Sequence, residues 1–299
     1  MKVIITGAAG QLGQALRCSG PASIAGQPLE LLATSRSGGE GAIPLDLADA
    51  AACRALVQEH RPDWLINAGA YTAVDKAESE PDLAQAVNAG APAAFAETLQ
   101  ATGGRLLQVS TDFVFNGRQS SPYRPDQLVD PLGVYGASKA AGESAAAGAL
   151  APERLCILRT SWVYGPVGQN FLLTMLRLMR EREQLGVVAD QVGCPTATVG
   201  LAQACWAVLE HGVAGIHHWS DAGAASWYDF AVVISELGRA AGLLEKPARI
   251  NPITTADYPT PARRPSYSLL DCTATREALQ LPPVHWREAL RQVIGDGVA

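Results

Sequence analysis

Near its N-terminus the chain has a short apolar segment, Lys2–Thr6, followed directly by three glycines spaced three residues apart, Gly7, Gly10 and Gly13. A strand, a glycine turn and a helix in this order are typical of domains that bind a dinucleotide. The first glycine allows the tight turn, the second lets the backbone approach the pyrophosphate at the helix N-terminus, and the third lets the helix pack on the strand. A plain glycine-rich turn is the alternative. The regular alternation of predicted strands and helices that follows favours the dinucleotide site.

Composition restricts the classes to which the chain can belong. Of its 299 residues, 48% are hydrophobic and 17% are charged, which is typical of a globular protein with a substantial core. The net charge of −6 argues against a surface that binds nucleic acid through its phosphates. We find neither a leader with an apolar block nor an apolar run of about 18 residues, so we expect a cytoplasmic protein that does not enter a membrane. Its six cysteines form no Cys-x-x-Cys pair, and we expect reduced thiols rather than a zinc site.

Short apolar segments alternate with helical ones over the first half of the chain. The predicted strands are Lys2–Thr6, Glu30–Thr34, Ile43–Leu47, Asp63–Ala68, Leu106–Ser110 and Leu155–Arg159. This alternation predicts the α/β class, with a doubly wound parallel sheet of the Rossmann type. After about residue 165 the elements are mixed, with an amphipathic helix predicted over Asn170–Arg182. We therefore expect a dinucleotide-binding domain over residues 1–165, a return of the chain to it around 185–220, and a smaller α/β substrate-binding domain made mainly from 166–299.

The end of the second strand indicates which nicotinamide cofactor the site prefers. An NAD-specific site places an acidic residue here, on the ribose hydroxyls of the adenosine. This chain has Thr34, Ser35 and Arg36 instead, and a hydroxyl with a guanidinium suits the 2′-phosphate of NADPH. We therefore expect NADPH to be preferred and NADH to be accepted as well. A solvated arginine in a loop is the alternative.

Other contacts to the cofactor are expected near the ends of the following strands. Asp46 can accept a hydrogen bond from the adenine amino group, or it can cap a helix that begins near Ala48. Small residues after the fourth strand leave room for the cofactor to cross the edge of the sheet. The further expected contacts are Gln11, Leu12, Leu47, Ala68, Gly69, Ala70, Tyr71 and Asn88.

Tyr135 and Lys139 are four residues apart, which places both side chains on one face of a helix, one turn apart. A tyrosine hydroxyl titrates near about 10, and a neighbouring ammonium lowers its pKa, so the pair makes a proton donor that works at neutral pH. Such a pair also occurs by chance on helix surfaces. Thr111 follows the fifth strand at its carboxyl end, where ligands bind in open α/β sheets. Its hydroxyl can donate to a substrate carbonyl, or it can cap a turn.

Together, the glycine motif, Thr111 and the pair of Tyr135 and Lys139 resemble those of the extended short-chain dehydrogenase/reductase superfamily. Within this superfamily, longer segments are similar to those of the dTDP-4-dehydrorhamnose reductases, namely residues 67–78, 110–115, 159–164 and 258–265. The similarity extends over nearly the whole chain. Gly69 stands where the family usually has alanine, and Phe113 where it often has tyrosine, and neither is a reacting group.

The resemblance implies that NADPH reduces the 4-keto group of dTDP-4-dehydro-β-L-rhamnose. This reaction is the last step of dTDP-L-rhamnose biosynthesis, which supplies cell-wall polysaccharide and the O antigen of lipopolysaccharide. In the family's mechanism Tyr135 would protonate the forming alkoxide, Lys139 would also hold the nicotinamide ribose, and Thr111 would orient the carbonyl oxygen. The residues that the resemblance implies for substrate binding are Val74, Thr111, Asp112, Tyr135, Trp162, Asn170 and Arg263.

The resemblance also bears on metals and partners. Some members of the family bind Mg²⁺ at a dimer contact, so a magnesium ion and a homodimer are further expectations; the sequence has no evident cluster of ligands, and we assign no residue to a metal. Two other functions stay open: a non-catalytic, NADP-binding regulatory subunit of the same superfamily, and a reductase of a related sugar nucleotide with a different sugar. The presence of Thr111, Tyr135 and Lys139 disfavours the regulatory subunit.

Overall fold

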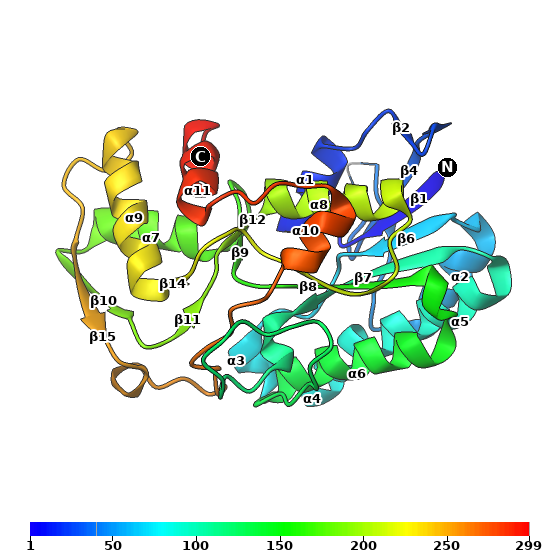
Figure 1. The fold of residues 1–299 in the computed structure, drawn as a ribbon, viewed down its shortest axis with the longest axis horizontal. Coiled ribbons are helices and arrows are strands. Elements are labelled where there is room, and N and C mark those ends of the chain that lie inside the picture. The colour runs from blue at the N-terminus through cyan, green and yellow to red at the C-terminus, as the bar shows by residue number, and fades with distance from the viewer. Residues whose placement is uncertain (40, 299) are drawn as a thin grey trace.

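The computed structural model describes residues 1–39 and 41–298. Within them a seven-stranded parallel sheet has the order β13-β8-β7-β6-β1-β4-β5 (Figure 1). The strands are β1 (Lys2–Thr6), β4 (Glu30–Ser35), β5 (Ile43–Pro44), β6 (Trp64–Asn67), β7 (Arg105–Thr111), β8 (Leu155–Thr160) and β13 (Gly215–Trp219). The order reverses at β1, which is the topological switch point of a doubly wound sheet. The predicted fold class is confirmed.

Helices cover both faces of this sheet, which is why its inner strands are apolar throughout instead of alternating. On one face lie α1 (Gln11–Cys18), α8 (Thr198–His211) and α10 (Thr273–Leu279), and on the other α2 (Ala50–His60), α5 (Ala91–Thr102) and α6 (Val134–Ala149). Side chains alternate along β1, so that Val3 and Ile5 join the first core and Ile4 the second. The sheet is therefore fixed between two cores.

The connection from β5 to α2 differs from its prediction. β5 ends at Pro44, and Asp49 is the residue that caps α2, because its Oδ1 accepts hydrogen bonds from the backbone N–H groups of Ala51 and Ala52 at 2.9 and 3.0 Å. Asp46 accepts from the N–H of Ala48 at 3.0 Å, inside the turn before the helix. The idea that Asp46 caps a helix beginning near Ala48 is therefore wrong.

A second, smaller unit with its own apolar core lies beside the sheet, at the left of Figure 1. It contains α7 (Phe171–Glu181), α9 (Trp227–Ala240), α11 (Trp286–Gly295) and the parallel pair of β10 (Gln184–Val188) and β15 (Arg249–Ile253). The predicted helix over Asn170–Arg182 is confirmed, with Asn170 as its N-cap. The chain crosses back to the sheet with α8 and β13, so its return begins at Thr198 rather than near residue 185.

Short elements complete the chain. They are β2 (Ser23–Ile24), β3 (Gln27–Pro28), α3 (Val74–Ala77), α4 (Pro81–Gln85), the π-helical turn η1 (Ala86–Gly90), the pair β9 (Val163–Tyr164) and β12 (Thr196–Ala197), and the pair β11 (Val192–Gly193) and β14 (Ala225–Ser226). In the part of the chain that the structure describes, no helix has the length and apolar character needed to cross a membrane.

Candidate active site

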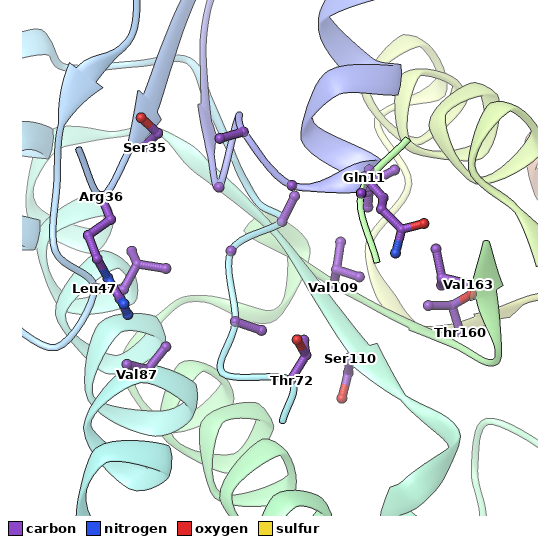
Figure 2. A pocket seen from close by; sticks show the side chains of 18 of the residues that line it. Gln11, Ser35, Arg36, Leu47, Thr72, Val87, Val109, Ser110, Thr160 and Val163 are labelled. Carbon is purple, nitrogen blue, oxygen red and sulfur yellow. The ribbon is translucent and has the colours of Figure 1, made fainter. Parts of the chain in front are cut away.

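A cavity of about 590 Å³ opens at the carboxyl ends of the central strands, beside the switch point of the sheet. Figure 2 shows that its lining side chains come from segments far apart in the sequence, from Gln11 on α1 to Thr160 on β8 and Val163 on β9. Among the residues expected to contact a cofactor, those that line the cavity are Gly7, Gly10, Gln11, Leu12, Ser35, Arg36, Leu47, Ala68, Gly69, Ala70, Tyr135 and Lys139. These expected contacts therefore lie together around one cavity.

The glycine turn has the geometry that its spacing predicts. Gly7 has φ +65°, a conformation that side-chain-bearing residues rarely adopt. A Cβ atom on Gly13 would lie 2.2 Å from the carbonyl oxygen of Gly7, so only glycine lets α1 pack this close to the turn. Gly10 is the N-cap of α1 and provides no side chain to cap it. The first N–H groups of α1 are consequently available to a ligand in the cavity.

Ser35 and Arg36 follow β4 at one end of the cavity. Figure 2 shows the Arg36 guanidinium directed toward Leu47, on the same side of the cavity as Val87. Ser35 is buried, and its hydroxyl donates a hydrogen bond to the carbonyl oxygen of Gly38 at 3.1 Å. Arg36 is exposed to solvent. Among residues 1–39 and 41–298, the lining at this end of the cavity offers a positive charge and includes no acidic residue.

Four expected cofactor contacts do not line the cavity, and each has a role beside it. Gly13 and Asp46 act in packing and in a turn, as described above. Asn88 is buried in η1, where its side chain bonds both backbone groups of Tyr71, accepting from the N–H at 2.9 Å and donating to the carbonyl oxygen at 3.0 Å. The Tyr71 hydroxyl donates to Glu80 at 2.8 Å. Asn88 and Tyr71 thus shape the loop after β6.

Gly69 lies against the glycine turn and also lines the cavity. A Cβ atom at this position would lie 2.5 Å from Leu47 Cδ1 and 3.2 Å from the backbone nitrogen of Gly7. An alanine here would require the Leu47 side chain to move. The departure from the family's usual alanine therefore lets Leu47 lie closer to the turn at Gly7.

The three expected catalytic residues meet at the ends of β7 and α6. Tyr135 is in the first turn of α6 and Lys139 is one turn later, and both line the cavity. Thr111 is the last residue of β7; its hydroxyl donates to Asp112 Oδ1 at 3.1 Å and lies beside Tyr135, where it lowers the pKa of that phenol. The Lys139 ammonium donates to the carbonyl oxygen of Val109 at 2.6 Å.

The pKa of Tyr135 differs from its prediction. Burial raises it to about 12, the neighbouring Thr111 hydroxyl lowers it and the charge of Asp112 raises it. The Lys139 ammonium donates to the carbonyl oxygen of Val109 and is not among the groups that lower the pKa of Tyr135. Burial lowers the pKa of Lys139 to about 8, and Glu143 opposes this change. In the structure, the expectation that Lys139 lowers the pKa of Tyr135 is therefore wrong, and the phenol is a protonated acid at neutral pH.

Several residues that were not expected as contacts also line the cavity. They are Thr72, Val87, Val109, Ser110, Thr160, Val163 and Gln169. Ser110 and Thr160 lie at the carboxyl ends of β7 and β8, a position that by itself marks ligand-binding residues in such sheets. The Thr160 hydroxyl is buried without a hydrogen-bond partner among the described residues, so it can bond a ligand.

A second cavity, of about 630 Å³, lies in the smaller unit, between α7 and the pair β10–β15. Phe171, Thr174 and Met175 line it from α7, and Trp227 from the start of α9. Trp162 stacks on Trp227 with ring centroids 3.6 Å apart and an interplanar angle of 9°. Trp162 has φ +47°, which strains the backbone of a bulky residue. This stack joins the segment after β8 to the second cavity.

The other residues implied for the substrate lie around these two cavities. Asn170 Nδ2 donates to Gln11 Oε1 at 2.8 Å, and its Oδ1 caps α7, so its polar atoms already have partners. Arg263 is exposed and lines neither cavity, whereas Arg264 lines the second one and pairs with Asp75 at 2.8 Å. Val74 begins α3, beside Asp75.

Asp112 is fully buried beside Thr111. Its Oδ2 has no hydrogen-bond partner among the described residues, and burial raises its pKa to about 6, against the neighbouring hydroxyls of Ser268 and Thr111 that lower it. Within residues 1–39 and 41–298, no group of three or more His, Cys, Asp or Glu side chains is placed to hold a metal ion.

Comparison with known proteins identifies the family. A family model described as "RmlD substrate binding domain" matches residues 1–298. A dTDP-4-dehydrorhamnose reductase from Aggregatibacter actinomycetemcomitans is 39% identical over 298 residues, which cover 98% of each chain. The chain belongs to the dTDP-4-dehydrorhamnose reductase family.

Two further relatives of the chain bear on the cofactor and the substrate. The crystal structure of the dTDP-4-dehydrorhamnose reductase from Bacillus anthracis, in complex with NADP, matches with a TM-score of 0.88 and 33% identity over 99% of each chain. A dTDP-4-keto-6-deoxy-D-glucose reductase from Streptomyces niveus is 37% identical, with 97% of this chain and 95% of the relative covered. Proteins similar over their full length thus reduce different keto sugars.

Proposed function

We propose that the protein is an oxidoreductase that uses NADPH to reduce the 4-keto group of dTDP-4-dehydro-β-L-rhamnose to dTDP-L-rhamnose, the last step of dTDP-rhamnose biosynthesis. The observation that carries the proposal is that Tyr135 and Lys139 line the cavity behind the glycine turn, with the Thr111 hydroxyl beside Tyr135, in a chain of this family. When bound, NADPH supplies the hydride for the ketone carbon.

The described residues fit a dinucleotide. The glycine turn leaves space that a Cβ atom would fill, and the first N–H groups of α1 are uncapped by any side chain. We assign the diphosphate to Gly10, Gln11 and Leu12 and the 2′-phosphate to Ser35 and Arg36. The unpartnered Thr160 hydroxyl and the Lys139 ammonium provide donors at the other end of the same cavity.

In the proposed reaction the chain's own groups handle the proton. Tyr135 keeps its proton at neutral pH and gives it to the alkoxide that forms on the former carbonyl oxygen. Thr111 orients that oxygen through its hydroxyl, and the Lys139 ammonium is assigned to the nicotinamide ribose of the cofactor. The thymidine diphosphate is assigned to the second cavity, where aromatic rings and Arg264 are available.

We further propose two domains. The dinucleotide-binding domain would be formed by residues 1–165 together with the returning segment Thr198–Trp219, and the substrate-binding domain mainly by the rest of 166–299. Separate apolar cores on the sheet and in the smaller unit support this division. A homodimer stays a prediction from the resemblance.

The test is NADPH oxidation by the purified protein, followed by its absorbance, with dTDP-4-dehydro-β-L-rhamnose made by the upstream enzymes. We expect turnover with this substrate and formation of dTDP-L-rhamnose, identified by chromatography against a standard. The relative that reduces dTDP-4-keto-6-deoxy-D-glucose supplies a second candidate substrate, so that sugar nucleotide is assayed in parallel. Preference for it would change the proposed sugar. No turnover with any dTDP-, UDP- or GDP-linked 4-keto sugar would favour the regulatory subunit.

A further inference from the structure

Glu143 is a buried carboxylate on α6, one turn beyond Lys139, and the proposed reaction does not use it. Its side chain is 7% exposed, and that of its partner Arg159 is 3% exposed. Placing two opposite charges inside a protein costs free energy unless their geometry satisfies both. The burial of this pair beside the cavity is therefore costly unless its hydrogen bonds serve the site.

The Glu143 carboxylate bonds two neighbouring strands at once. Arg159 on β8 donates to it from Nη2 at 2.7 Å and from Nε at 3.0 Å. The Ser110 hydroxyl on β7 donates to Glu143 Oε1 through a short hydrogen bond. Ser110 and Arg159 are directly paired in the sheet. One carboxylate on α6 thus fixes the helix to the ends of the two strands that form the cavity wall.

These bonds act next to the expected catalytic residues. The Lys139 ammonium bonds the carbonyl oxygen of Val109, and Glu143 bonds the side chain of Ser110, the next residue. The residue after Ser110 is Thr111, and the turn of α6 before Lys139 carries Tyr135. The two contacts therefore set how α6 lies on β7, and with it where the Thr111 and Tyr135 hydroxyls meet.

Three elements place polar or charged groups against Glu143. Lys139 faces it from α6 and Arg159 from β8, while Ser110 on β7 is neutral. Behind Arg159, His218 on β13 approaches Nη1 at 3.4 Å, but burial and the charge of Arg159 lower its pKa to about 3, so it adds no charge. Burial favours the neutral form of Lys139, and Glu143 is the charged group that opposes this effect.

We propose that Glu143 is a positioning residue of the reductase site, which fixes α6 on β7 through Ser110 and Arg159 and keeps the Lys139 amine in its charged form. The inference deepens the proposed function and rests on it, because the charge of Lys139 matters through the cofactor that the lysine holds.

The experiment compares wild type and Glu143→Gln in the pH dependence of kcat/KM. Charged Lys139 is the active form, so the wild-type rate should fall as pH rises through about 8, the pKa of Lys139. Loss of the negative charge should move this alkaline limb about one pH unit lower. The matched control is Glu97→Gln, which removes a carboxylate from the exposed pair with Arg54 and should leave the limb in place. An unmoved limb in a folded Glu143→Gln protein overturns the proposal.

A second readout needs no turnover. The dissociation constant of NADPH is measured by fluorescence across the same pH range. As pH increases, it should begin to rise at a lower pH in Glu143→Gln than in wild type. If the wild type turns over no keto sugar, the proposed function fails, and this binding titration alone decides the inference. Equal pH dependence of binding in both proteins overturns it.

Glu143→Gln leaves Arg159 buried without its counter-charge, which by itself lowers the melting temperature. The double variant Glu143→Gln/Arg159→Gln removes both charges and is tested alongside it. Arg159 carries the opposite charge beside Glu143, so removing both charges should move the limb less than Glu143→Gln does. A limb that stays in place in Glu143→Gln but moves in the double variant would overturn the proposal.

Discussion

Arg264 Nη2 lies 2.8 Å from Asp75 Oδ2, and this ion pair joins the segment after β15 to α3 of the sheet unit. Asp75 Oδ1 also accepts from the backbone N–H of Ala262 at 3.2 Å. The hydrogen bond from Arg264 holds the pKa of Asp75 below its usual value. Because Arg264 lines the second cavity, the pair holds a wall of the proposed substrate site in place.

We therefore expect Asp75→Asn to raise the KM for the keto sugar by about two- to fivefold, with kcat within about twofold. A partly exposed pair contributes about 1 kcal/mol or less, which corresponds to a change of that size. Steady-state kinetics with saturating NADPH provide the measurement. The control is Glu181→Gln, which breaks the exposed pair with Arg177 on α7 and should leave both constants unchanged. A loss of kcat at constant KM in Asp75→Asn would contradict this role.

Tyr135→Phe should lower turnover by roughly 10²–10⁴, the usual contribution of a positioned general acid. The phenyl ring still fills its place, including the edge-to-face contact with Phe113 at 5.5 Å, so NADPH affinity should persist. Turnover and fluorescence titration with NADPH measure the two effects separately. Tyr228→Phe, on α9, is the control for loss of a hydroxyl elsewhere. More than a tenth of wild-type turnover in Tyr135→Phe would mean that another group gives the proton.

Asp112 should make the protein less stable as pH rises. Its pKa in the folded protein is about 6, above its ordinary value of 3.8, so between these values the folded state binds more protons than the unfolded state. Stability is therefore highest below about pH 4 for this group and falls as pH rises through 6. We expect Asp112→Asn to raise the free energy of unfolding at pH 8 by about 1–3 kcal/mol and to lower turnover, since Thr111 bonds this side chain.

Denaturant titrations of both proteins at pH 5 and pH 8 test this prediction. The gain from Asp112→Asn should be larger at pH 8 than at pH 5. Equal stability of the two proteins at both pH values would show that the pKa of Asp112 is not raised in the folded protein.

Arg36 should set the choice of cofactor. It lines the cavity at the end of β4, where none of the lining residues that the structure describes is acidic and would repel a 2′-phosphate. We expect the wild type to prefer NADPH over NADH by roughly ten- to a hundredfold, since charge-assisted bonds contribute about 1.5–3 kcal/mol each before losses to solvent. Arg36→Ala should remove most of this preference and leave the rate with NADH nearly unchanged.

The measurement is kcat/KM for both cofactors in both proteins, with Arg291→Ala on the distant helix α11 as the control. Equal use of the two cofactors by the wild type, or an undiminished preference in Arg36→Ala, would show that the guanidinium stays in solvent.

Local patterns predicted those parts of the fold and the site that depend on local chemistry. The requirement for Gly13 follows from the spacing of the glycines, and the bounds of α7 follow from Asn170 and the apolar periodicity after it. The helical pairing of Tyr135 and Lys139 also depends only on their spacing. Each of these features is set within one short, continuous segment of the chain.

Features that depend on distant segments could not be predicted from the sequence. The pKa of Tyr135 depends on burial by several segments, and no spacing reveals how much water they exclude. The choice between Arg263 and Arg264 depends on which side chain faces Asp75, in a proline-rich segment without a regular period. The pairing of β10 with β15 joins strands more than 60 residues apart in the chain, and two isolated apolar runs do not specify one another.

The place of β13 at the edge of the sheet limits the order in which the chain can fold during synthesis. β8 is complete at Thr160, but its partner β13 and the helix α8 that covers its apolar side come from Thr198–Trp219. Until that segment leaves the ribosome, β8 presents an unpaired edge beside uncovered apolar surface, which is a template for aggregation. A fragment of residues 1–165 should therefore precipitate on expression, whereas one extended through β13 has its edge strand and its covering helix in the same chain.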